Sequence, residues 1–209
     1  MNACASKILA ETCLRHNALL IHVSTDYVFD GKGNRPSRED DPTQPASVYG
    51  KTKLKGEQAI QASGCNYCIV RTAWLYSTTG KNFVKTMLTL AENRDQVNVV
   101  CDQMGTPTYA ADLAQAIMAI LSHYGRQPVH EIFHFTDEGV TTWDRFAAAI
   151  FELAGKTCLV NPITTEQYPT KATRPAYSVL DKSKITQTLG IHIPFWKDSL
   201  ARCINELNQ

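Results

Sequence analysis

The stretch STDYVFDG, residues 24–31, decides how this sequence folds, because it stands where a buried run becomes polar. The preceding run, Leu19 to Val23, is apolar apart from one histidine, which is typical of a buried strand. We therefore predict a strand over residues 19–29. The end of this strand carries two hydroxyls, a carboxylate and two aromatic rings. Such polar groups are rarely placed in a hydrophobic core, so this end is a candidate functional site.

Strands and helices alternate on both sides of this stretch. Residues 3–15 carry apolar side chains at helical spacing, and residues 36–45 form a polar loop with three prolines. Further helices are expected at 47–64, 82–94, 110–122 and 143–154, and further strands at 67–71, 97–101 and 132–135. Either Thr141 or Thr142 could cap the last helix. The pattern predicts an α/β protein with a parallel sheet between helices, whose ligands bind beyond the carboxyl ends of the strands.

The composition excludes several classes of protein. The 209 residues carry 21 lysines and arginines against 20 aspartates and glutamates, a net charge of +1, which gives no signature for a nucleic-acid partner. No run approaches the roughly 18 uninterrupted apolar residues of a membrane span, and the first residues lack a signal-peptide layout. Seven scattered cysteines fit a reducing compartment. We expect a cytoplasmic protein without a membrane partner.

Two short motifs match metal-binding or redox patterns, but both lie on expected strands, where the required side chains would be too far apart. HEIFH, residues 130–134, matches a zinc-hydrolase pattern that works only on a helix. On the strand expected here, the two imidazoles would stand roughly 13 Å apart. Cys65 and Cys68 lead into another strand, where their side chains would point to opposite faces about 10 Å apart. We expect structural histidines, buried inert thiols and no metal; a zinc hydrolase is a remote alternative.

The candidate catalytic pair is Tyr49 and Lys53, in the sequence YGKTK. Because they lie four residues apart on a predicted helix, the phenol and the ammonium share one face. Of the eight tyrosines, only Tyr49 has a lysine four residues on, although chance alone would give about 0.5 such pairs. The alternative is a solvated lysine on an exposed helix face. The polar end of the preceding strand favours the catalytic interpretation, because both could reach one crevice.

The motifs also resemble a known family. Y-x-x-x-K after a strand that ends in Ser or Thr is the catalytic signature of the short-chain dehydrogenase/reductase superfamily, in its extended branch. The segments STDYVFDG, YGKTKLKGE, RTAWLY, GKNF, DQMGTPTYAADLA and RPAYSVLD are similar, in this order, to the bacterial dTDP-4-dehydrorhamnose reductases. The resemblance implies a Rossmann-like parallel sheet with flanking helices and a small C-terminal substrate-binding α/β subdomain.

The resemblance also implies a reaction. Members of the family use NADPH or NADH to reduce the 4-keto group of dTDP-4-dehydro-L-rhamnose, which gives dTDP-L-rhamnose for cell-surface polysaccharides. In this sequence Tyr49 would donate the proton, and Lys53 would lower the tyrosine pKa and bind the nicotinamide ribose. Thr25 would hydrogen-bond the ketone. Ser24 points to the other face of the strand and is expected to bond the backbone.

Further residues match the family around the substrate. Asp26 and Tyr27 would define the sugar pocket, and Trp74 would form an apolar wall. Gln103, Thr106 and Arg174 match motifs near the nucleotide-sugar cleft, where the Arg174 guanidinium would suit a diphosphate. Each of these last three has an alternative role as a turn or surface residue, and Phe29 is expected in the core.

The resemblance divides the chain into two parts. Residues 1–75 and 110–140 would be the C-terminal part of the NAD(P)-binding domain, and residues 76–109 and 141–209 the substrate-binding portion. The sequence holds no Gly-rich turn of the kind that binds a pyrophosphate, because its one G-x-G leads into a charged loop.

We therefore expect the C-terminal two-thirds of a reductase, with the N-terminal strands missing. Such a chain would form a three-stranded sheet, self-associate through the exposed edge and bind NADPH negligibly. A non-catalytic binding role stays open, because the regulatory β subunit of methionine adenosyltransferase resembles the same family. An intact Tyr49–Lys53 pair does not distinguish that role from catalysis.

Overall fold

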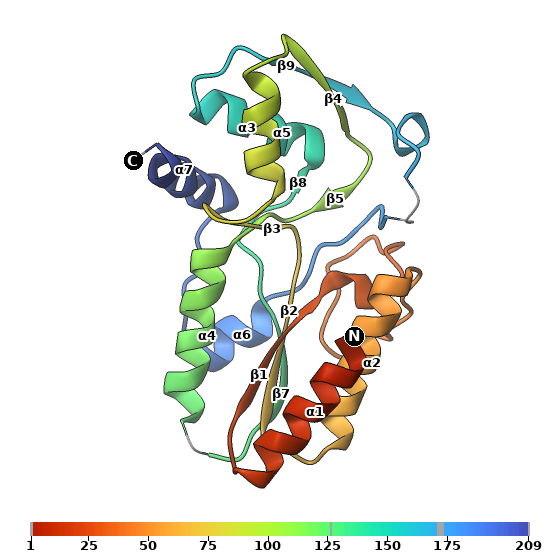
Figure 1. The fold of residues 1–209 in the computed structure, drawn as a ribbon, viewed down its shortest axis with the longest axis vertical. Helices are drawn as coiled ribbons and strands as arrows, with labels where there is room; N and C mark the ends of the chain where they lie inside the picture. Colours follow the sequence, from red (N-terminus) through yellow and green to blue (C-terminus); the bar gives the residue numbers. More distant parts are fainter. Residues whose placement is uncertain (1, 126, 171–173, 209) are drawn as a thin grey trace.

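A three-stranded parallel sheet forms the centre of one of the two lobes of the molecule (Figure 1). The computed structural model describes residues 2–125, 127–170 and 174–208. The strands stand in the order β1 (Leu20–Thr25), β2 (Tyr67–Thr72) and β7 (His130–His134). The predicted three-stranded parallel sheet is therefore confirmed.

The register of the sheet brings the polar ends of its strands together. Thr25 at the end of β1 lies opposite Thr72 at the end of β2. Arg71, also on β2, lies opposite His134 at the end of β7. Because all three strands run in the same direction, these residues lie at one edge of the sheet, the edge formed by the carboxyl ends of the strands, where parallel sheets bind ligands.

Helices cover both faces of the sheet (Figure 1). On one face lie α1 (Asn2–Arg15) and α2 (Val48–Ala62), where Ile60 packs with Ile69 of β2. On the other lie α4 (Ala110–Tyr124) and α6 (Ser183–Leu189), whose apolar side chains pack with Val70 of the same strand. Successive residues of a strand point to opposite faces, so the continuous apolar run of β2 fills both layers.

The second lobe has its own apolar core. It consists of α3 (Phe83–Ala91), α5 (Trp143–Leu153) and α7 (Trp196–Leu207), together with the parallel pair β4 (Gln96–Val100) and β9 (Leu159–Ile163). Phe146, Ile150 and Leu200 are among its fully buried side chains. Between the lobes run two short pairs: β3 (Leu75–Tyr76) with β6 (Thr108–Tyr109), and β5 (Met104–Gly105) with β8 (Thr141–Thr142).

Most of the predicted elements are present, but several boundaries were wrong. The strand predicted over residues 19–29 ends at Thr25, because the chain turns there into the 3-10 helix η1 (Asp26–Val28). The helix predicted over 82–94 ends at Ala91. Thr142 is the N-cap residue of α5, as one of the two candidates predicted, but its side chain makes no capping hydrogen bond; its hydroxyl donates to the Asp144 carboxylate.

Sequence patterns missed the last third of the chain and one pairing. β9, α6, α7 and the 3-10 helix η2 (Thr165–Gln167) were not predicted. The strand predicted at 97–101 exists as β4, but it pairs with β9 outside the central sheet. The predicted division into two domains stays a prediction; Ile185, from the stretch 141–209, packs on the sheet with Phe133.

The two misleading motifs adopt the predicted conformations. HEIFH forms β7, and Cys65 and Cys68 are buried, with Cys68 on β2. All seven cysteines are free thiols. In the described part of the chain, no three histidine, cysteine or acidic side chains are grouped as metal ligands would be. None of the described helices is both long and apolar enough to cross a membrane.

Candidate active site

The hydroxyl of Thr25 turns the chain at the end of β1. Its oxygen accepts a hydrogen bond from the Tyr27 amide at 3.3 Å, which starts the 3-10 turn. The same hydroxyl donates to the Asp26 carboxylate at 2.9 Å. Thr25 and Asp26 are both buried. Two predicted site residues are therefore joined directly to each other at the ligand-binding edge of the sheet.

The start of α2 is pressed against this turn. Ser47 caps the helix by accepting a hydrogen bond from the Gly50 amide at 3.0 Å. A Cβ at position 50 would collide with the Tyr27 carbonyl oxygen, so glycine allows the close approach. The rings of Tyr27 and Tyr49 consequently meet edge to face, with centroids 5.6 Å apart. Tyr49 is 50% exposed, so its phenol is accessible to a ligand.

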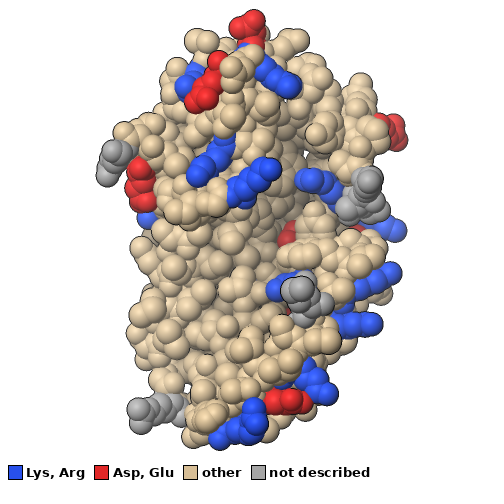
Figure 2. Space-filling view, viewed as in Figure 1, with Lys and Arg blue, Asp and Glu red and all other residues tan. Residues whose placement is uncertain are grey.

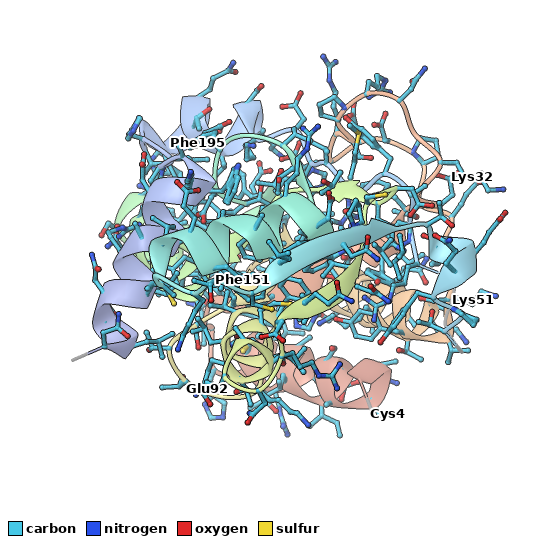
Figure 3. All side chains as sticks on the ribbon, turned by 90° about the horizontal axis from the view of Figure 1, so that it is seen from above. Cys4, Lys32, Lys51, Glu92, Phe151 and Phe195 are labelled. Carbon is cyan, nitrogen blue, oxygen red and sulfur yellow. The ribbon has the colours of Figure 1, made fainter. Side chains whose placement is uncertain are left out.

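Lys53 reaches from α2 to the sheet. Its ammonium donates to the Val23 carbonyl oxygen at 2.7 Å, close to the end of β1. Burial lowers the pKa of Lys53, while the nearby Glu57 carboxylate acts in the opposite direction. Lys51, two residues before Lys53 in the same motif, points outward into solvent (Figure 3). Of the two lysines of YGKTK, only Lys53 is therefore directed at the sheet.

A buried ion pair fixes α2 to the sheet. Glu57 of α2 is 1% exposed and Arg71 of β2 is 3% exposed, and Nη2 of the arginine lies 2.8 Å from Oε2 of the glutamate. Ser24 of β1 also donates to this carboxylate. The expectation that Ser24 bonds the backbone was wrong, because its side chain faces α2 and a charged acceptor lies within reach there.

His134 completes this buried group. Its Nε2 lies 3.4 Å from Nη1 of Arg71, and its Nδ1 lies 3.0 Å from the Ser37 carbonyl oxygen. Burial and the adjacent Arg71 charge lower the pKa of His134 to about 3. A neutral imidazole in this position connects β7 to the loop before α2. Phe29, predicted to be core, is half-buried with its ring over the Arg71 guanidinium.

Trp74 occupies the junction of the two lobes in a strained backbone conformation. Its φ is 47°, in the left-handed region that residues other than glycine rarely adopt. The indole stacks on Trp143 of α5, with centroids 3.5 Å apart and planes 10° from parallel. A Cβ at Gly105 would lie 2.5 Å from the Trp74 ring, so the absence of a side chain there makes room for it. Strain of this kind concentrates at functional sites.

The segment 174–181 brings Arg174 to the same region. The Tyr177 amide donates to the Gly31 carbonyl oxygen at 3.0 Å, which ties the segment to the loop after η1. Arg174 and Tyr27 consequently line one small pocket. The Arg174 charge also acts on Tyr27, whose pKa is raised by burial and by Asp26 and lowered by the guanidinium.

Gln103 and Thr106 are occupied by internal hydrogen bonds. The Gln103 amide donates to the Thr165 hydroxyl at 3.0 Å, and the Thr106 hydroxyl donates to the Gly139 carbonyl oxygen at 2.7 Å. Both side chains are buried. Their contact with a substrate therefore stays a prediction, as do the roles of the other site residues.

The structure adds residues that sequence reasoning missed. Glu57 follows Lys53 by four positions on α2, and this spacing could have marked it as a member of the same helix face. Arg71 stands out as a charge in an otherwise apolar strand. Nothing in the sequence links Trp74 with Trp143, which are joined only by the packing of the lobes.

A family model described as the RmlD substrate binding domain matches residues 1–209. The chain belongs to this family. It is 44% identical over 208 residues to a dTDP-4-dehydrorhamnose reductase of Aggregatibacter actinomycetemcomitans, covering 96% of this chain and 71% of the relative. It is 43% identical over 192 residues to the spore coat polysaccharide biosynthesis protein SpsK of Bacillus subtilis, covering 92% of this chain and 66% of the relative.

A solved structure agrees with these relatives. The dTDP-4-dehydrorhamnose reductase of Bacillus anthracis, solved in complex with NADP, superposes with a TM-score of 0.94 at 34% identity, covering 99% of this chain and 72% of that one. The predicted resemblance and the Rossmann-like α/β fold are thus confirmed. The chain spans about two thirds of the length of SpsK and somewhat more of the two reductases.

Proposed function

We propose that this chain acts as a dTDP-4-dehydrorhamnose reductase, which reduces the 4-keto group of dTDP-4-dehydro-L-rhamnose with NAD(P)H to give dTDP-L-rhamnose. This sugar nucleotide serves the biosynthesis of bacterial cell-surface polysaccharides. The observation that carries the proposal is the convergence of the Thr25 turn, Tyr49 and Lys53 at one edge of the sheet. Identity of about 40% to reductases over nearly the whole chain supports it.

The chemistry assigns a task to each of these three side chains. The reduced nicotinamide, when bound, supplies a hydride to C4 of the sugar, and the C4 oxygen then requires a proton. Tyr49 donates that proton from its half-exposed phenol. Lys53 stabilises the resulting tyrosinate, and its ammonium has two donors left beyond the one on Val23. Thr25 donates a hydrogen bond to the ketone and polarises it.

The surrounding residues fit a nucleotide sugar. Asp26 and Tyr27 border the sugar, and Trp74 offers it an apolar wall. Arg174 binds the diphosphate, and Gln103 contributes after exchanging its bond to Thr165. Lysine and arginine side chains line both lobes near their boundary on the face shown in Figure 2, which favours an anionic ligand there.

The described residues fit only part of the cofactor. Tyr49 and Lys53 are placed to hold the ribose at the nicotinamide end, and a bound nicotinamide supplies the hydride. In the described stretches, no Gly-rich turn connects a strand to a helix, so they provide no cradle for the pyrophosphate. We accordingly propose that these residues alone bind NADPH or NADH negligibly.

We further propose that the chain self-associates through β1 and acts in the cytoplasm. Within the described residues β1 is an edge strand, and Val23 on it is exposed, as are Ile8 and Leu14 on α1. A second copy that paired along β1 would cover this edge. Light scattering should then give a mass above that of one chain. Seven unpaired cysteines support action in the cytoplasm.

The direct test is an assay of NADPH oxidation with dTDP-4-dehydro-L-rhamnose. A chimera that adds the unmatched part of the Aggregatibacter reductase to this chain should be active, while the chain alone should show little cofactor binding by calorimetry. In the chimera, Tyr49→Phe should lower kcat by about 10² or more with little effect on substrate binding, as expected for a lost general acid.

Tyr168 provides a matched control for this variant. It is 55% exposed, close to the 50% of Tyr49, and directly follows η2. Tyr168→Phe should retain wild-type turnover. Near wild-type turnover in Tyr49→Phe would remove this residue from the mechanism. Ligand binding without any turnover in the chimera would instead favour the regulatory role.

A further inference from the structure

Thr25 has one hydroxyl proton, and the structure already uses it. The hydroxyl donates to Oδ1 of Asp26 at 2.9 Å, and its oxygen accepts from the Tyr27 amide. A hydroxyl can donate only one hydrogen bond. With Asp26 ionised, Thr25 therefore has no proton left for a ketone oxygen, although the proposed reaction requires one there.

Asp26 is buried without a cation. The residue is 5% exposed, and among the described residues its Oδ2 has no hydrogen-bond partner. The Ser178 hydroxyl faces it from segment 174–181, and the backbone amide of Tyr27 faces it from η1. The titratable group that senses the Asp26 charge is the adjacent Tyr27 phenol, which is also influenced by Arg174 from the same segment and Tyr49 from α2.

A buried carboxylate without a positive partner is unfavourable, so it tends to take up a proton. Burial raises the pKa of Asp26 to about 7, against the opposing effect of the Thr25 and Ser178 hydroxyls. The neutral and ionised forms of this carboxyl are then both populated near neutral pH.

We propose that Asp26 is a positioning residue which, by binding a proton from solvent, releases the Thr25 hydroxyl for the substrate ketone. In the neutral form, the proton sits on Oδ1 and is donated to Oγ of Thr25. The threonine proton then turns from Asp26 toward the ketone oxygen. No bond is broken in the sugar or the cofactor by this step. The inference rests on the proposed function, because it assumes that Thr25 binds the ketone.

The first experiment needs no catalysis. In the chain labelled with ¹³C-aspartate, the carboxyl carbon that disappears in Asp26→Asn should titrate near pH 7, not near the ordinary value of about 4. Thr25→Val removes a donor to the ionised form and should raise this midpoint further. Asp41 serves as an internal reference, because its hydrogen bonds from Arg35 lower its pKa to about 2.

The second experiment follows kcat against pH in the active chimera. An asparagine at position 26 keeps an N–H donor for Thr25 at every pH, as only the neutral aspartic acid does. The ratio of kcat in Asp26→Asn to kcat in the wild type should therefore rise about tenfold between pH 6 and pH 8, the change expected when a group of pKa 7 ionises. Asp26→Ala neither ionises nor accepts the Thr25 proton, so its ratio to the wild type should rise with pH by the same factor.

The outcomes separate the two proposals. An Asp26 carboxyl that titrates near its ordinary value, or a constant ratio in Asp26→Asn, would refute the gating of Thr25 while leaving the reductase function intact. Titration near pH 7 in a protein whose chimera never turns over would refute the reductase function, and with it the task assigned to Thr25. A variant that failed to fold would be detected in the same NMR spectra, and Thr25→Val would then carry the test.

Discussion

Two buried carboxyl groups lie on opposite sides of the end of β1 and have opposite surroundings. Ser24 donates a hydrogen bond to Glu57 of α2. The next residue, Thr25, donates to Asp26 at the ligand-binding edge of the sheet. Glu57 is held by the Arg71 guanidinium, whereas Asp26 has hydroxyls and an amide around it. A paired carboxylate can stay charged in the interior and fix an element, while an unpaired one responds to pH.

A third buried carboxyl group, that of Asp137, resembles Asp26 because one of its oxygens also lacks a hydrogen-bond partner among the described residues. Asp137 accepts a hydrogen bond from the Tyr109 amide at 3.0 Å, and its Oδ1 has no partner among the described residues. Burial raises the pKa of Asp137 to about 8. If the comparison is correct, loss of the cation beside Glu57 should damage the fold, and neutralisation of Asp137 should change how stability depends on pH.

The largest effect is expected from Arg71→Met. The substitution leaves the Glu57 carboxylate buried without its cation, and removal of one partner of a buried pair typically costs about 3–5 kcal/mol of unfolding free energy. Urea unfolding monitored by circular dichroism measures the loss.

The double variant Glu57→Met/Arg71→Met is the control for this prediction. It removes both charges and fills the space with apolar side chains, which in comparable cases is close to neutral for stability. The double variant should therefore recover most of the stability lost in Arg71→Met. An equally unstable double variant would show that the pair matters for packing more than for charge.

A smaller effect is expected from Asp137→Asn. The folded state keeps the Asp137 proton up to about pH 8, whereas the unfolded chain releases it near pH 4. The folded state thus binds more protons in this window, so the wild-type unfolding free energy should fall as pH rises through it. Asn cannot ionise, and the variant should lose about 2 kcal/mol less than the wild type between pH 5 and pH 6.5.

Urea unfolding at several pH values tests this difference. Asp26 contributes a change of the same sign up to about pH 7, so the slope should decrease in Asp137→Asn without vanishing. Parallel curves for the variant and the wild type would mean that Asp137 is ionised in the folded state, and that an unpaired buried carboxyl does not by itself respond to pH here.

The smallest effect is expected from Gly105→Ala. The new Cβ would lie 2.5 Å from the Trp74 ring and 2.7 Å from the Ser178 hydroxyl, which faces Asp26. The ring must shift, at a cost of about 1 kcal/mol or slightly more in stability. If Trp74 lines the sugar pocket, the KM of the chimera for the sugar nucleotide should rise about threefold or more.

Gly33→Ala is the matched control, because a Cβ there would make only ordinary contacts, the nearest at 3.5 Å from the Arg35 carbonyl oxygen. It should leave both KM and stability close to wild type. An unchanged KM in Gly105→Ala with the expected loss of stability would assign Trp74 to the core.

Local patterns in the sequence were sufficient for much of the fold. The apolar runs of β1 and β2 predicted buried parallel strands, and Ser47 marked the start of α2. The spacing of Tyr49 and Lys53 predicted one shared helix face, because the helical repeat is fixed by backbone geometry. β9 and α6 escaped prediction, because packing between distant segments stabilises them more than local periodicity does. α7 was overlooked although its buried residues Trp196, Leu200 and Cys203 recur at helical spacing.

The sequence by itself determined which groups this protein can use: a Thr25 hydroxyl after a buried strand, a Tyr49–Lys53 pair on a helix, and an aromatic Trp74 after the next strand. The tertiary structure alone decided what surrounds each of them. Glu57 received a cation from β2 and Asp26 received none, although both are single acidic residues in ordinary sequence contexts. The physical reason is that burial and charge pairing depend on contacts between residues far apart in the chain, which only the folded arrangement of the lobes creates.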